Sequence, residues 1–367
     1  TLPMFTILSK RSKKKLQRSK KMTFSNFDNC SRNIHILPDE LLIYIFKWLP
    51  VETLICCENV SVKWQKLARD RTLWKPLVFV YSGKPGQTEV SKKNLEIISS
   101  HSELVYAIKI QYVYSYPLIK SVIDQCKNLI SLELIMCRIE EGFVSDILKW
   151  PRLKKLNLKN SILILNETSL LLPFDKLKDL QCLSLSDFGL YPTNWDGLLQ
   201  CRNLSQLFID KIRNLTLDFV TELIIAQQNV LETFHIYGLD CINNNSIQLL
   251  SNCPRLKDLA IIRCEKLTDV AFLALASLKS IESLQLWNNS NFSEKALLAT
   301  LSTPKFKKLR SLSLSKIQNV TPVVVDLISE YYKNLKFLAL YQCPRIIDTD
   351  YEKQLKSKFR NIDVVLY

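Results

Sequence analysis

Apolar residues recur along most of this chain in short clusters that are separated by nearly constant distances. From Val105 onward, an apolar residue is followed by others three and five places later, and this unit restarts every 24 to 28 residues. The starting positions are Val105, Leu129, Leu153, Leu180, Leu204, Leu231, Leu256, Ile281, Leu309, Leu335 and Phe359. A period of about 20 to 29 residues is typical of units that each supply one short parallel strand and one helix or helical turn. The pattern therefore predicts about eleven strands over residues 104–367.

The segments between these strands have the apolar spacing of helices, as at 217–226 and 267–278. One unit cannot bury its apolar face alone, so stacked units must share a continuous core. We therefore expect an α/β fold, in which a small three-helix module precedes a curved solenoid with a parallel sheet on its concave face. Residues 359–367 form the expected closing strand, and the apolar run 73–79 is a candidate for a degenerate first strand.

One repeat, CPRLKDLAIIRCEKLTDVAFLAL at 253–275, places Cys264 eight positions after Leu256. Cys137 and Cys343 share this offset, and Asn289 replaces them in its own repeat. The pattern resembles the cysteine-containing subclass of leucine-rich repeats, in which the residue at this offset turns inward and bonds the backbone. Other residues stand there elsewhere, which predicts several irregular turns: Ser161, Phe188, Ile212, Leu239 and Ile317. Metal binding or nucleophilic catalysis is the alternative for these thiols, but the chain has three His, none spaced from a Cys as a ligand or base.

Residues 37–50, LPDELLIYIFKWLP, predict a short helix with more apolar positions than one core can cover. Pro38 suits its first position, Asp39 and Glu40 complement the helix dipole, and Pro50 ends it. Two more short helices are expected at 53–58 and 61–69. The apolar side chains that this small module cannot bury must then be covered either by the flank of the solenoid or by another protein.

These residues resemble the F-box. The positions that match its motif are Leu37, Pro38, Glu40, Leu41, Leu42, Ile45, Phe46, Leu49, Leu54, Val60, Ser61, Trp64, Leu73 and Trp74. Together with the repeats, the chain resembles the F-box/leucine-rich-repeat family over residues 34–367.

This resemblance implies a non-catalytic substrate receptor of a Skp-cullin-F-box ubiquitin ligase, which directs a target protein to proteasomal degradation. The F-box would bind the Skp adaptor, and through it a cullin-RING ligase, by Leu37, Pro38, Leu41, Leu42, Ile45, Phe46, Leu49, Trp64 and Trp74. A scaffold or interaction protein that does not direct ubiquitination is the alternative.

The target would bind the concave face, because positions two, four and six after each repeat start point to one side of the sheet. The candidate target-binding residues are Phe208, Asp210, His235, Tyr237, Trp287, Phe337 and Tyr341. Aromatic side chains there suit anchors of an interface. The alternative is that they pack on one another or under a loop. Lys155 and Lys159 form a further basic patch that would suit an acidic or phosphorylated target.

The distribution of charge identifies one further segment, at the N-terminal end of the sequence. The chain has 367 residues, 47% of them hydrophobic, and a net charge of +15. Residues 1–33 hold nine Lys or Arg and one Asp, a net of +8, which predicts a disordered basic tail that serves as a nuclear import signal or a solvated arm. The expected organisation is the tail at 1–33, the F-box at 34–80, a linker leading into the solenoid at 81–103, and leucine-rich repeats at 104–367.

Several classes of function are disfavoured by what the sequence lacks. It has no apolar stretch of membrane-spanning length and no secretory signal, and its eleven cysteines include no Cys-x-x-Cys pair, so we expect a protein of the cytoplasm or nucleus. No phosphate loop occurs among its six glycines, and we expect neither an enzyme nor a cofactor. Nucleic acid is not an expected partner, because the positive charge lies mostly in the tail and the rest of the chain has no recognisable nucleic-acid motif.

Overall fold

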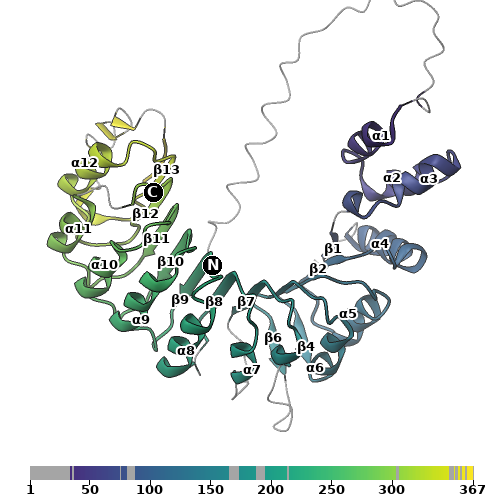
Figure 1. Cartoon of the computed structure of the whole chain (residues 1–367), viewed down its shortest axis with the longest axis horizontal. Helices are drawn as coiled ribbons and strands as arrows, with labels where there is room; N and C mark the ends of the chain where they lie inside the picture. Colours follow the sequence, from purple (N-terminus) through teal and green to yellow (C-terminus); the bar gives the residue numbers. More distant parts are fainter. Residues whose placement is uncertain are drawn as a thin grey trace, which may run out of the picture.

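A curved stack of strands and helices makes up most of the molecule, with a small group of helices at its N-terminal end (Figure 1). The structure is a computed structural model that describes residues 34, 37–74, 76–80, 87–164, 173–186, 195–212, 215–302, 306–346, 351, 354–355, 358–359 and 362–366. The basic tail at 1–33 and the linker residues 81–86 lie outside the described residues.

The inner layer of the stack is a twelve-stranded parallel sheet in which the strands follow chain order. Its strands are β1 (Leu77–Val80), β2 (Ala107–Gln111), β3 (Ser131–Ile135), β5 (Lys155–Leu158), β7 (Cys182–Ser186), β8 (Gln206–Asp210), β9 (Thr233–Tyr237), β10 (Asp258–Ile262), β11 (Ser283–Trp287), β12 (Ser311–Ser313), β13 (Phe337–Ala339) and β14 (Asp363–Val365). The strands β2 to β13 of this sheet each begin two residues after a repeat start, and β14 begins four residues after Phe359. The expected fold class, a helical module followed by a leucine-rich-repeat solenoid, is confirmed.

Helices and helical turns form the outer, convex layer (Figure 1). They are α5 (Tyr116–Ile123), α6 (Gly142–Asp146), η4 (Ile147–Lys149), η5 (Phe174–Lys176), α7 (Asp196–Leu199), α8 (Leu217–Gln227), α9 (Asn244–Leu249), η6 (Leu250–Asn252), α10 (Asp269–Leu275), α11 (Glu294–Leu301), α12 (Pro322–Tyr331) and η7 (Pro344–Ile346). A second parallel pair, β4 (Arg138–Glu140) with β6 (Ile162–Ile164), was not expected from the sequence. No described helix is both long and apolar enough to span a membrane.

The strands place alternate side chains in the core, as the repeat pattern requires. In β11, Leu284 and Leu286 are fully buried, whereas Gln285 and Trp287 on the concave side are half-buried. Adjacent strands pair start to start, with Leu259 opposite Leu284. Equivalent apolar residues therefore stack on one another, and a single core extends along the solenoid.

Nine strands of the main sheet are followed by one residue in the left-handed backbone region, seven places after the repeat start. These residues are Tyr112, Met136, Asn160, Lys211, Gly238, Arg263, Asn288, Lys316 and Gln342, with φ between 50° and 61°. Seven of their N–H groups continue the ladder between repeats; that of Met136, for example, donates to the Lys159 carbonyl at 3.0 Å. The Asn160 N–H donates to the Ser186 hydroxyl instead. The left-handed region costs a residue with a Cβ about 1 kcal/mol or more, so stacking must hold the chain there.

The residue that follows the left-handed position is buried in every case except Val113, which is half-buried, and its chemistry varies. The Cys343 thiol donates to the Leu314 carbonyl at 3.1 Å, and Asn289 Nδ2 donates to the Ile261 carbonyl at 2.8 Å. Ser161 makes an equivalent bond, from its hydroxyl to the Leu134 carbonyl at 2.9 Å. The apolar residues at this offset, Ile212, Leu239 and Ile317, are buried instead.

The expectation of irregular turns is therefore wrong at Ser161, Ile212, Leu239 and Ile317, because the residue before each has the same left-handed backbone as in the cysteine repeats. Phe188 lies outside the described residues.

The left-handed turn predicts an unusual preference for glycine. Met136→Gly should have a free energy of unfolding about 1 kcal/mol higher than Met136→Ala, because only the alanine keeps the Cβ that opposes this backbone conformation. The same pair of substitutions at Leu273, on the exposed face of helix α10, should show the opposite order, since glycine weakens a helix relative to alanine. Urea unfolding measures both differences, and the same order at both positions would contradict this role for the turn.

Candidate functional site

Three short helices, α1 (Asp39–Phe46), α2 (Val51–Cys57) and α3 (Val62–Ala68), form the module ahead of the sheet. Helix α1 begins after Pro38, which has extended backbone angles, and it ends four residues before Pro50, earlier than expected. Lys63 Nζ donates to the Leu37 carbonyl at 2.8 Å and lies 3.1 Å from the Asp39 carboxylate, so α3 holds the start of α1.

One side of α1 faces the interior of the chain. Leu42 and Phe46 are at most 1% exposed, and the Phe46 ring lies 5.0 Å from the ring of Trp64, edge to face. Trp74 is also buried, and its Nε1 donates to the Ala68 carbonyl at 3.0 Å. The expectation that Leu42, Phe46 and Trp74 contact an adaptor is therefore corrected. They are core residues that hold the three helices together.

The other side of α1, together with the turn that follows it, carries large apolar side chains in solvent. Leu41 is 50% exposed, Tyr44 60%, Ile45 39% and Trp48 76%. We call these four residues the apolar face. They recur at three- and four-residue intervals and so share one side of the helix.

The remaining predicted adaptor residues differ in their access to solvent. Pro38 is exposed, whereas Leu37, Leu49 and Trp64 are half-buried against the core. Tyr44 and Trp48 were not among the predicted site residues. The seven-residue interval from Leu41 to Trp48 is the signal by which the sequence could have identified Trp48.

The module is fixed to the solenoid through helix α4 (Gln87–His101), which occupies most of the segment expected to be a linker. The Trp74 ring lies 5.4 Å from the His101 ring, and His101 Nε2 is 3.2 Å from Glu58 of the module. Arg69 joins this group through a 2.9 Å contact to Glu58. Buried rings and charges at this junction favour a rigid connection rather than a flexible one.

On the concave face, some predicted target-binding residues contact one another. The Phe208 and His235 rings lie 4.8 Å apart, edge to face, and His235 Nε2 is 2.9 Å from the Asp258 carboxylate. The hydrogen bond and charge of His235 outweigh the effect of burial and lower the pKa of Asp258. Asp210 and Phe337 are half-buried on the same face.

Three other predicted residues, Tyr237, Trp287 and Tyr341, are each accompanied by a cation. Lys211 Nζ lies 5.1 Å from the centre of the Tyr237 ring. Lys316 Nζ lies 5.8 Å from the Trp287 ring and 5.9 Å from the Tyr341 ring. The sequence reasoning did not identify these cations, because it considered strand positions and they lie in the turn one residue beyond.

The predicted basic patch at Lys155 is neutralised within the chain. Lys155 Nζ is 2.5 Å from a Glu133 oxygen, and Asn157 Nδ2 donates to the same carboxylate at 3.3 Å. The N-terminal part of the concave face therefore offers less free charge than its sequence indicates.

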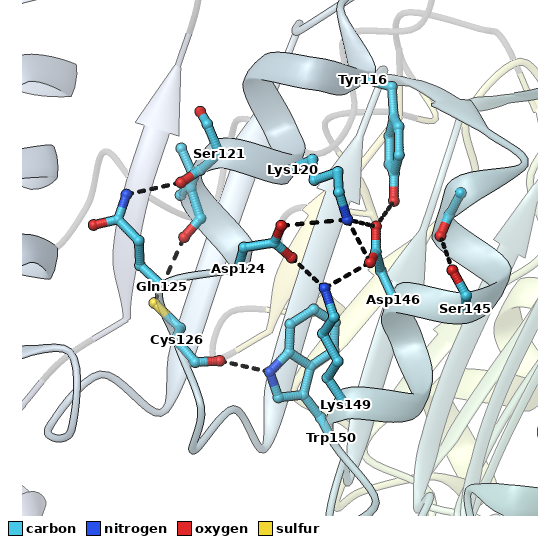
Figure 2. Close-up of polar contacts among 12 residues, drawn as sticks. Tyr116, Lys120, Ser121, Asp124, Gln125, Cys126, Ser145, Asp146, Lys149 and Trp150 are labelled. Atoms are coloured by element: carbon cyan, nitrogen blue, oxygen red, sulfur yellow. Dashed lines mark hydrogen bonds and ion pairs between the residues drawn. The ribbon is translucent and has the colours of Figure 1, made fainter.

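Asp146, on the convex side, is the carboxylate with the most hydrogen bonds from side chains among the described residues. Figure 2 shows that it accepts bonds from Tyr116 at 2.6 Å, Lys120 at 2.6 Å and Lys149 at 2.7 Å. Burial alone raises the pKa of Asp146, but these three bonds outweigh burial and hold the pKa below its ordinary value. The group joins helix α5 to α6 and η4, which indicates a structural role.

The cysteines are also structural in their surroundings. Burial raises the pKa of Cys126 to about 12 and that of Cys264 to about 11, so both thiols stay protonated at neutral pH. Among the described residues, no three His, Cys, Asp or Glu side chains gather as metal ligands would.

A cavity of about 560 Å³ lies at the opposite end of the strands from the turns. It is lined by Glu282, Lys307, Lys308, Arg310, Asn334 and Lys336.

Comparison with known proteins identifies the helical module. A family model described as F-box-like matches residues 34–80, which contain α1, α2 and α3. The chain therefore carries an F-box-like domain followed by a leucine-rich-repeat solenoid.

Three solved structures resemble between 60% and 89% of this chain in general shape. The yeast complex of Rad7 and Elc1 contains a chain with 13% identity and a TM-score of 0.45, covering 89% of this chain and 92% of that one. An internalin, inlF, from Listeria monocytogenes has 18% identity and a TM-score of 0.44, with coverages of 71% and 72%. Internalin C2 from the same organism has 18% identity and a TM-score of 0.39, with coverages of 60% and 83%. At these scores and identities the likeness is one of general shape alone.

The Asp146 group predicts a defined pH dependence of stability. Asp146→Asn should lower the free energy of unfolding at neutral pH by about 2 kcal/mol, because hydrogen bonds between charged groups contribute on that order. A lowered native pKa means that this contribution is complete above the unfolded pKa of about 3.9 and is lost as the pH falls through the native value. The difference between wild type and variant should thus be constant down to about pH 5 and shrink below about pH 4.

Urea unfolding at several pH values tests this dependence. Asp124→Asn, at the more exposed partner of Lys120 and Lys149, is the matched control and should cost less than about 1 kcal/mol. A stability difference for Asp146→Asn that is as large at pH 3 as at pH 7 would show that the charge of Asp146 does not act as described.

Proposed function

We propose that this chain, with its F-box-like domain ahead of a leucine-rich-repeat solenoid, is the substrate-recognition subunit of a Skp-cullin-F-box ubiquitin ligase. It binds the Skp adaptor through the F-box, and through that adaptor a cullin-RING ligase. The repeats hold a target protein, and the chain itself performs no chemistry. The observation that carries this proposal is the exposed apolar face on a helix whose domain matches the F-box-like family.

The adaptor site we propose consists of the apolar face and those predicted adaptor-binding residues that solvent can reach. Leu41 and Ile45 remain from that set, with Pro38 and the half-buried Leu37 and Leu49 at the edges. Tyr44 and Trp48 are added because they are large, exposed side chains that lie next to Leu41 and Ile45. Adjacent exposed apolar residues of this kind mark an interaction site. Trp64 supports the surface from behind, since it packs against the buried Phe46.

The rigid junction at Trp74 and His101 supports a receptor function. A target on the concave face would lie at a fixed position relative to an adaptor on α1, because the contacts of Glu58, Arg69 and His101 connect the two parts. A receptor benefits from this fixed geometry, since the target must be presented to chemistry that takes place elsewhere.

The target site we propose is the C-terminal part of the concave face. Tyr237, Trp287 and Tyr341 provide half-buried aromatic surface, which suits anchors of an interface. Phe208 and His235 contact each other, so we assign them, with Asp210 and Phe337, to the border of this site.

A compartment that keeps thiols reduced fits the ten described cysteines, all of which are free. We therefore propose that the protein acts in the cytoplasm, the nucleus or both.

The adaptor site predicts the effect of changing exposed residues alone. Leu41→Ser, Ile45→Ser and Trp48→Ser together should weaken adaptor binding on the order of 100-fold or more, because three apolar side chains would no longer be buried in the complex. Folding should be unaffected, since all three point away from the core. Co-purification with a Skp adaptor and a cullin, followed by titration of the adaptor, measures the effect.

The matched control changes three equally exposed apolar residues on the solenoid helices, Val270→Ser, Leu273→Ser and Val323→Ser, and should retain both partners. If the unaltered chain captures neither partner, the apolar face is not an adaptor site and the ligase proposal is wrong.

The target site predicts a separation between adaptor binding and target turnover. Trp287→Ala with Tyr341→Ala should leave the fold and adaptor binding intact, because both side chains are on the concave surface, far along the chain from α1. Proteins whose half-lives lengthen on depletion of the chain should return to their normal turnover with wild type and not with the double variant. If depletion changes no half-life although the adaptor binds, the chain is a scaffold rather than a substrate receptor.

A further inference from the structure

Cations and aromatic rings alternate along the rim of the concave face, from one repeat to the next. Six successive repeats, from that of β8 to that of β13, contribute in order Lys211, Tyr237, Arg263, Trp287, Lys316 and Tyr341. The aromatics stand six places after their repeat starts and the cations seven places after theirs. We call these six residues the cation–aromatic ribbon.

Backbone hydrogen bonds pair each cationic residue with the aromatic residue of the next repeat. The Lys211 N–H donates to the Tyr237 carbonyl at 2.7 Å, the Arg263 N–H to the Trp287 carbonyl at 3.0 Å, and the Lys316 N–H to the Tyr341 carbonyl at 2.7 Å. All three cations have the left-handed backbone of the repeat turn. Their positions are therefore set by the stacking of the repeats.

The side chains are also positioned before any partner arrives. Lys211 and Arg263 lie 5.1 Å and 6.0 Å from the centre of the Tyr237 ring between them, and Lys316 lies within 6 Å of both Trp287 and Tyr341. A cation at this distance from a ring is attracted by it and loses little further freedom on binding.

The charge of the ribbon is not cancelled within the described part of the chain. Lys211, Arg263 and Lys316 form none of the ion pairs found among the described residues, unlike Lys155 farther along the face. One carboxylate, Asp210, lies in the same two rows of positions over these six repeats, against three cations. In these two rows the charges sum to 3 − 1 = +2, and Glu265 adds one carboxylate near Arg263, so the cations still outnumber the carboxylates.

The spacing of the cations limits the kind of partner that can pair with all three. They occur in every second repeat, and strands lie about 4.8 Å apart, so successive cations are about 10 Å apart along the rim. An extended chain in the polyproline II conformation rises about 3.1 Å per residue with three residues per turn, so every third side chain recurs after about 9 Å on one side.

From this match we propose that the ribbon binds an extended acidic protein segment with a carboxylate at every third residue. The acidic groups pair with Lys211, Arg263 and Lys316, and the intervening residues lie next to Tyr237, Trp287 and Tyr341 without needing an open ring face. This inference rests on the proposed function in that it assigns a chemical class to the target of the concave face.

Two other occupants fit the ribbon less well. Single-stranded nucleic acid needs open ring faces on which bases stack, whereas each aromatic of the ribbon already has a cation within about 6 Å of its ring centre. The chain's own N-terminal segment, residues 1–33, has a net charge of +8 and would be repelled.

Titration of fluorescent peptides with the full chain tests the proposal. The probe is a peptide of about five Glu-Pro-Pro triplets, which favours polyproline II and places carboxylates about 9 Å apart. The comparison peptide has the same number of glutamates in Glu-Pro-Pro-Pro units, in which the carboxylates no longer match the ribbon. We expect the triplet peptide to bind on the order of 10-fold more tightly, since each exposed ion pair contributes a few-fold in affinity.

A charge-matched pair of variants locates the binding site. The triple variant Lys211→Ser, Arg263→Ser and Lys316→Ser should bind the triplet peptide on the order of 10-fold more weakly than wild type. Lys307→Ser with Arg310→Ser and Lys336→Ser removes the same charges from the basic cavity and should leave binding unchanged. The N-terminal segment is present in both variants, so its attraction for acidic peptides cancels in the comparison.

Several outcomes would overturn the proposal. They are equal losses in both variants, equal affinity for the two peptides, absence of peptide binding, or a single-stranded oligonucleotide that binds more tightly and depends on the ribbon. Adaptor binding by α1 is measured separately, so a negative result here leaves the ligase proposal standing, and failure to bind the adaptor leaves the peptide result interpretable.

Discussion

The structure depends on one constraint, which is that no repeat can bury its apolar face without the next. Stacking pairs the strands start to start and places Leu259 against Leu284 and their equivalents. In nine repeats the same stacking holds one residue in the left-handed region, where N–H groups such as that of Met136 reach the following repeat. The turn is therefore a property of the assembled stack. This explains why Tyr, Met, Lys, Arg and Gln occur there as well as Asn and Gly, although each residue with a Cβ is less favourable than glycine in this conformation.

The same constraint separates scaffold from surface. Inward positions are occupied by whatever fits, whether the thiol of Cys343, the hydroxyl of Ser161 or the side chain of Ile317. Side chains that point outward on the concave side do not fill the core, so their chemistry differs between the two ends of the solenoid. The N-terminal part pairs its charges internally, as Lys155 does with Glu133, while the C-terminal part keeps cations beside aromatic rings.

The F-box-like module must also bury its apolar residues, but it has only three short helices with which to do so. Three helices of seven or eight residues enclose a small interior, and Leu42, Phe46 and Trp74 are used to fill it. The large apolar residues that remain, above all Trp48, lie in solvent. Docking onto α4 through Trp74 and His101 adds the support that so small a module needs and fixes its orientation to the sheet.

The repeat period, the strand positions and the helical module follow from the order of residues alone, because apolar spacing reports which side of a strand or helix is buried. The concave position of Trp287 and Tyr341 follows for the same reason. The division of α1 into a core side and an outer side could not be foreseen, since both sides are apolar and only the packing of α3 shows which one is covered. Nor could the pairing of Lys211, Arg263 and Lys316 with aromatic rings. Those contacts join residues about 25 positions apart, and they exist only once neighbouring repeats are stacked in register.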